Sequence, residues 1–132
     1  MSRLENFKVF NFNEGVPYVS VTNNGLTFNK SVVMKLGYPE HVLLLTDEDS
    51  CCIAVQKCDT DNPHAAAFYK PKKSKVISVR WNGRDLLNTI CEMTGWDLSM
   101  HSYRVDGALL RDDNAMLFNL REAKELKSVV DG

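Results

Sequence analysis

Turn-forming residues divide this chain into short segments, and their spacing limits its possible folds more than any other feature. Residues 23–25 (Asn-Asn-Gly) and 106–107 (Asp-Gly) are typical of tight hairpin turns, because Asn, Asp and Gly tolerate the positive φ that such turns need. Further polar turns stand at residues 47–50 and 112–114. The longest apolar run, residues 42–45, fits a buried strand and is far shorter than the roughly 20 residues of a membrane-spanning helix.

The residue pattern between these turns predicts strands and three helices. Strands are expected at residues 7–12, 17–22, 26–28, 41–46, 51–57, 76–81, 100–105, 108–111 and 115–120. The first helix follows Asn29, whose side chain can cap the free amides of the first turn, and it ends at Gly37. The second follows Asn82 and Gly83 and ends at Gly95, and residues 121–130 are expected to form a terminal helix.

The two halves of this outline resemble each other. In residues 26–29 and again in residues 79–82, a strand ends in an aromatic residue that is followed by Asn. A helix then stops at Gly37 or Gly95, another aromatic residue follows, and a hairpin with a polar tip comes next. Repetition of such a unit indicates that neither copy can bury its apolar face alone.

Residues 25–38 read Gly-Leu-Thr-Phe-Asn-Lys-Ser-Val-Val-Met-Lys-Leu-Gly-Tyr, and a strand, an acidic turn and a second strand follow them. This stretch resembles the swapped-hairpin unit of the AbrB superfamily, in which a strand and a short helix ending in Leu-Gly-hydrophobic precede a hairpin. The resemblance covers residues 17–57 directly and residues 76–120 by analogy. It implies that two units interlock into one barrel, and that DNA is bound through basic side chains on the barrel surface, where this segment offers Lys30 and Lys35.

The predicted fold is therefore of the α+β class, with two strand-helix-hairpin repeats forming one barrel-like core. We expect a single domain over residues 1–132, with repeats at roughly 17–58 and 76–120 and a connector at 59–75. A chain of 132 residues with 44% hydrophobic and 25% charged residues has ordinary globular composition. The N-terminus lacks the apolar stretch of a signal peptide, so a cytoplasmic location, no membrane partner and four reduced cysteines are expected.

The most basic segment of the chain is the best candidate for a binding site. Between residues 70 and 80 it has five basic residues and no acidic one, although the whole chain carries a net charge of −1. Lysines neutralise phosphates and neighbouring aromatic residues can stack on bases, so the segment could bind nucleic acid. The alternative is a solvated linker stiffened by Pro71. The candidate residues are Lys70, Lys72, Lys73, Lys75 and Arg80.

No other residue group predicts a site. The segment from Asp59 begins like a calcium loop, but His64 and Lys70 stand where such a loop needs Gly and Glu. His41, His64 and His101 lack flanking residues in a catalytic or metal-binding pattern, so neither an enzyme nor a metal or other cofactor is expected. The two tryptophans that bracket the second helix are expected to pack in the core or at the helix ends, with a ligand-binding role as the alternative.

These observations favour a non-enzymatic, small regulatory or adaptor domain of AbrB-like type with weak DNA binding. The alternative is a protein-protein interaction module with no nucleic-acid role. DNA and another protein both stay open as partners, and so does a homo-oligomer. A basic face on the folded chain would favour DNA, whereas scattered charge would favour the adaptor.

Overall fold

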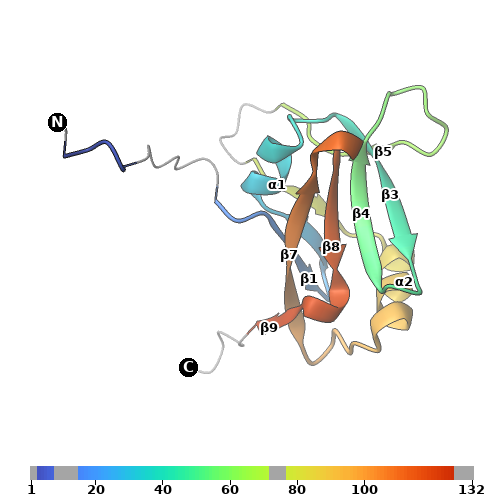
Figure 1. Cartoon of the computed structure of the whole chain (residues 1–132). Helices are drawn as coiled ribbons and strands as arrows, with labels where there is room; N and C mark the ends of the chain where they lie inside the picture. The colour runs from blue at the N-terminus through green and yellow to red at the C-terminus, as the bar shows by residue number, and fades with distance from the viewer. Residues whose placement is uncertain (1–2, 8–14, 72–76, 127–132) are drawn as a thin grey trace.

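One antiparallel sheet, curled into a half-barrel, makes up most of the molecule (Figure 1). The computed structural model describes residues 3–7, 15–71 and 77–126. Eight of the nine strands in the described residues follow one another in the order β5-β3-β4-β8-β7-β1-β2-β6, and the ninth, β9, pairs with β7 beside this path. The predicted strand at 7–12 lies almost wholly outside the described residues.

The described residues form nine strands, two helices and two 3₁₀ turns. The strands are β1 (Tyr18–Thr22), β2 (Gly25–Phe28), β3 (His41–Asp47), β4 (Cys52–Lys57), β5 (Ala66–Ala67), β6 (Val79–Trp81), β7 (Ser102–Leu110), β8 (Ala115–Asn119) and β9 (Lys124–Leu126). The helices are α1 (Lys30–Lys35) and α2 (Arg84–Thr94), with 3₁₀ turns η1 (Arg111–Asp113) and η2 (Leu120–Glu122). Within the described ranges no helix has the length and apolar character needed to cross a membrane.

Strand β7 belongs to both halves of the curled sheet. Before Gly107 it pairs with β1 on one edge and with β9 on the other, and from Gly107 onward it pairs with β8. The sheet therefore forms two layers that share one strand. We call β6-β2-β1-β7-β9 layer A and β5-β3-β4-β8-β7 layer B. A Cβ atom on Gly107 would lie 2.9 Å from side-chain atoms of Met116 and Phe118, so this glycine lets β8 approach closely where the layers join.

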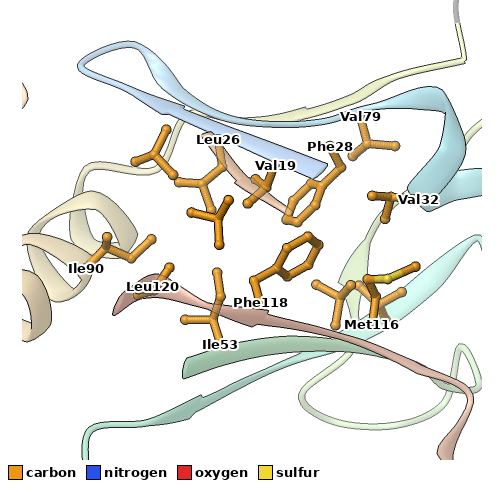
Figure 2. Packing of buried hydrophobic residues seen from close by; sticks show 14 of the residues in the cluster. Val19, Leu26, Phe28, Val32, Ile53, Val79, Ile90, Met116, Phe118 and Leu120 are labelled. Carbon is orange, nitrogen blue, oxygen red and sulfur yellow. The ribbon is translucent and has the colours of Figure 1, made fainter. Parts of the chain in front are cut away.

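The core lies between the two layers, and the helices close its two ends (Figure 2). Phe28 of layer A and Phe118 of layer B are both fully buried, and their ring centroids lie 5.7 Å apart. Val32 of α1 lies at one end of this core and Ile90 of α2 at the other, and both are fully buried. The alternation of buried and outward residues along the strands thus leaves each layer with an outer face.

The local signals at the helix ends are partly confirmed. Asn29 is the N-cap of α1: its Oδ1 accepts from the amide of Val32 at 3.2 Å and from that of Tyr18 at 3.0 Å. Gly95 ends α2 in the left-handed conformation with φ 79°. The predicted Asn82 cap is wrong, because the N-cap of α2 is Gly83, which makes no side-chain hydrogen bond.

The predicted α+β fold of two equivalent strand-helix-hairpin repeats is also wrong. The described residues form a mostly antiparallel sheet with two helices of 6 and 11 residues. Strand β2 pairs on both sides, with β1 and β6, whereas β6 pairs with β2 alone. Strand β3 pairs with β4 and the two-residue β5, whereas β7 pairs with β1, β8 and β9. The corresponding segments therefore have different strand neighbours.

Two further sequence signals misled the prediction of the second half. Asp106 and Gly107 form no hairpin turn; they lie inside β7, where the glycine is needed for close packing and not for a positive φ. Residues 124–126, expected within a terminal helix, form β9 because β7 offers them a free edge. Residues 127–130 of that expected helix lie outside the described residues.

Replacing Gly25 by Ala tests how closely β2 and β6 approach. Gly25 has φ +137°, and an added Cβ would lie 2.3 Å from the carbonyl oxygen of Trp81. We expect Gly25→Ala to lower the free energy of unfolding by more than about 2 kcal/mol, from backbone strain and overpacking together. Gly15→Ala, which meets nothing within 4 Å, is the matched control. Equal urea-unfolding midpoints for both variants would contradict the close β2–β6 contact.

Candidate nucleic-acid interface

The structure describes two of the five predicted nucleic-acid residues and places them on different elements. Lys70 is exposed and follows Tyr69, whose amide donates to the carbonyl of Pro39 and whose ring contacts that of Tyr38. Lys70 therefore follows a residue that packs against the loop between α1 and β3. Arg80 is exposed on β6. The other three candidates, Lys72, Lys73 and Lys75, lie outside the described residues.

Arg80 forms part of a row of basic and hydroxyl side chains that crosses the whole of layer A. Going from strand to strand, Arg80 lies opposite Thr27, and Thr27 lies opposite Ser20. Ser20 in turn lies opposite Arg104, and Arg104 lies opposite Lys124. Residues directly opposite each other on neighbouring strands point to the same face of a sheet, so all five share one face. We call them the layer A row.

The layer A row lies on the outer face because the neighbouring residues point into the core. Val19 and Val21, on either side of Ser20, are fully buried, and so are Leu26 and Phe28 on either side of Thr27. Successive residues of a strand alternate between the two faces. With strands about 4.8 Å apart, the three cations of the row extend over about 19 Å along the sheet.

Arg104 is held in place along this face by two neighbours. Its Nε donates to Oδ1 of Asp106 at 3.2 Å, and its guanidinium carbon lies 3.9 Å from the centroid of the Tyr18 ring. These contacts order the cation without burying it, since its side chain keeps 36% of its surface exposed. The carboxylate of Asp106 offsets one of the three positive charges of the row. The row therefore keeps a local excess of positive charge, although the whole chain has a net charge of −1.

The histidines are not brought together. His41 Nδ1 lies 3.4 Å from the hydroxyl of Thr60, and His101 forms an ion pair with Glu125 on β9. His64 is exposed in the turn that follows Asn62. Among the residues that the structure describes, no group of three or more His, Cys, Asp and Glu side chains could hold a metal ion.

Both tryptophans contact other aromatic rings. Trp81 packs edge-on against Phe28 and Phe68, and its Nε1 donates to the carbonyl of Ala67 at 3.0 Å. That hydrogen bond links β6 to β5, the two ends of the strand order. Trp96 stacks on Tyr103, with ring centroids 4.0 Å apart. The expectation that these tryptophans pack against the core is confirmed.

The cysteines differ in exposure and chemistry. Cys51 is buried, and its thiol lies 3.5 Å from the carbonyl oxygen of Met93. Burial, with a smaller contribution from the negative charge of Asp97, raises the pKa of the Cys91 thiol. Cys52 and Cys58 are half-buried, and all four thiols are free.

Sequence reasoning found Arg80 but missed Arg104 and Lys124. Both lie far from the basic segment in the chain and reach the same face only through the pairing of β6, β2, β1, β7 and β9. The sequence signal that could have placed them on the outer face is the alternation of polar and apolar residues along the strands. Ser20 stands between two buried valines, and Arg104 stands between Tyr103 and Val105, which both face the core. Alternation gives the face of each strand but not the order of the strands.

Comparison with known protein families, with curated proteins and with solved structures finds no match to this chain. The resemblance to the AbrB superfamily therefore stays a prediction from the sequence. What the chain does has to be inferred from its own surfaces.

Thiol labelling tests the environments of the cysteines. Because the thiolate is the reacting form, the raised pKa of Cys91 slows its alkylation at neutral pH, and Cys51 is shielded by burial. We expect iodoacetamide to modify Cys52 and Cys58 quickly in the folded protein and the other two slowly. Non-reduced protein should give four thiols after denaturation. Peptide mass spectrometry over time measures both, and fast labelling of Cys51 or Cys91 would contradict the packing around them.

Proposed function

We propose that this chain is a non-enzymatic regulatory domain that binds the phosphate backbone of duplex DNA weakly through the outer face of layer A. The observation that carries the proposal is the continuous layer A row, in which three cations and two hydroxyls share one face of five neighbouring strands. Lysine and arginine neutralise phosphates and release counterions, and hydroxyls donate to phosphate oxygens.

The chemistry of the face favours backbone contacts without sequence readout. Lys124 and Arg80 are exposed at opposite ends of the row, so both can contact phosphates. The aromatic ring on this face, Tyr18, is covered by the guanidinium of Arg104 and so is not free to stack on an unpaired base. A sheet face of this kind supplies no helix or ribbon to enter the major groove, where base edges are read.

Binding measured against salt tests this proposal. Three cations release few counterions, so we expect a log-log salt slope no steeper than about −3 and loss of binding to duplex DNA near physiological salt. The variant Arg80→Gln/Arg104→Gln/Lys124→Gln should bind at least about tenfold more weakly at low salt. Fluorescence anisotropy with duplexes of two unrelated sequences, and with a single strand of the same length, measures these effects.

The matched control removes three cations from other surfaces. Arg3→Gln/Arg84→Gln/Arg121→Gln, at exposed positions outside the strands of both layers, changes the net charge equally, so it separates the row from a general effect of charge. A second comparison replaces Lys70, Lys72, Lys73 and Lys75 by Ala. If this variant abolishes binding while the row variant does not, DNA binds to the basic segment, and the proposal that it binds to the layer A row is wrong. Tight, sequence-selective binding at physiological salt would contradict the backbone-only mode.

A further inference from the structure

The two layers of the sheet have outer faces of opposite character. An antiparallel sheet usually packs one face on the core and exposes a polar face to water. Layer A follows this rule through its row of cations and hydroxyls. Layer B does not: the outward residues in the middle of β3, β4, β8 and β7 are almost all apolar. Figure 1 shows these four strands side by side.

The pairing register arranges these outward residues in two rows. One row is Leu45, Ala54, Leu117 and Ala108, and the other is Leu43, Gln56, Ala115 and Leu110. The residues between them along the strands, such as Val55 and Met116, are fully buried in the core. The one polar member, Gln56, donates its side-chain amide to the carbonyl of Asp113 at 2.9 Å, which turns it toward the end of the sheet. The two rows together are the apolar face of layer B.

The apolar face has a ridge and a hollow. Leu45 on β3 keeps 43% of its surface exposed, and Leu110 on β7 keeps 38%. Between Leu45 of β3 and Leu117 of β8, the side chains of Cys52 and Ala54 are small, and a hollow of ≈ 320 Å³ opens there and extends to Asp47 and Ser50 at the acidic turn. A surface that carries protruding leucines at its two edges and a hollow between its strands can fit against a copy of itself.

We propose that the apolar face of layer B binds the same face of a second copy of this chain. Strands β3, β4 and β8 are 5–7 residues long, and together with β7 beside them, at about 4.8 Å per strand, they give layer B an outer face of about 19 Å by 17–24 Å. A single helix, about 10 Å across, would leave half of that width uncovered, whereas the same face of a second copy matches it. Roughly 320–460 Å² per copy is well below the ~800 Å² of a standard interface, so the dimer is weak and depends on concentration.

Charge at the ends of the face sets the relative orientation of the two copies. The acidic turn of Asp47, Glu48 and Asp49 follows the end of β3, whereas Lys57 and Arg111 lie at the opposite end of the face, beside Asp112 and Asp113. A two-fold axis along the strands would bring the two acidic turns together. An axis across the strands instead brings each acidic turn to the opposite end, where Lys57 and Arg111 balance the charges of Asp112 and Asp113. We therefore infer the second arrangement, in which each residue contact occurs twice.

Sedimentation equilibrium over a wide concentration range tests the dimer. The mass should rise from 15.0 kDa toward twice that value as the concentration increases. The variant Leu45→Lys/Leu117→Lys buries two cations at the contact, so we expect it to stay a monomer at concentrations at least tenfold above the wild-type midpoint. The matched control Asn24→Lys/Asn88→Lys, at exposed positions of the β1–β2 turn and of α2, should dimerise like the wild type.

Several outcomes would overturn the proposal. A wild-type mass of 15.0 kDa at every concentration would do so, and so would a dimer that the control variant disrupts and the Leu45→Lys/Leu117→Lys variant does not. If that variant fails to fold, as judged by circular dichroism, Leu110→Lys at the other edge of the face gives an independent measurement. Because the layer A row lies on the opposite outer face, loss of DNA binding and loss of dimerisation are separate results.

Discussion

The structure depends on one strand that serves two layers. Strand β7 runs through Gly107 without a break, pairing with β1 and β9 before this residue and with β8 from this residue onward. A side chain at Gly107 would collide with Met116 and Phe118, which are both fully buried, so the approach of β8 to β7 requires the missing Cβ. If the chain turned at Asp106 and Gly107 into a hairpin, β1 and β8 would lose their common neighbour, and the core between the two layers would open.

The same strand also shows where the outer surface changes chemistry. Its outward residues are Arg104 and Asp106 before Gly107, and Ala108 and Leu110 after it. The change coincides with the change of pairing partner, from the polar face of β1 to the apolar face of β8. Core packing does not require this difference, because the inward residues are apolar on both sides. The contrast between the two outer faces is the physical basis of both proposals.

The sequence allowed accurate prediction where a structure is decided by neighbours in the chain. Asn29 caps its helix, Gly95 ends the next one, and the pair of residues before Gly25 joins β1 to β2 in a hairpin. Prediction failed where distant segments decide. The Asp106–Gly107 pair has the residues of a turn, but contacts with β1 and β8 keep it extended. Arg104 and Lys124 join Arg80 only through strand order, so the layer A row could not be found from the basic segment.

The placement of the two outer faces limits how the proposed activities combine. The buried core separates layer A from layer B, so a contact on one face does not cover the other. When two copies pair through layer B, their basic rows point away from each other. Such a dimer would present its rows to two separate duplex segments and not twice to one, so pairing would not add the two rows into a single stronger site. The geometry of such a dimer thus favours bridging of two duplexes over tight binding to one. Weak binding to a single duplex is also what three cations on one face predict.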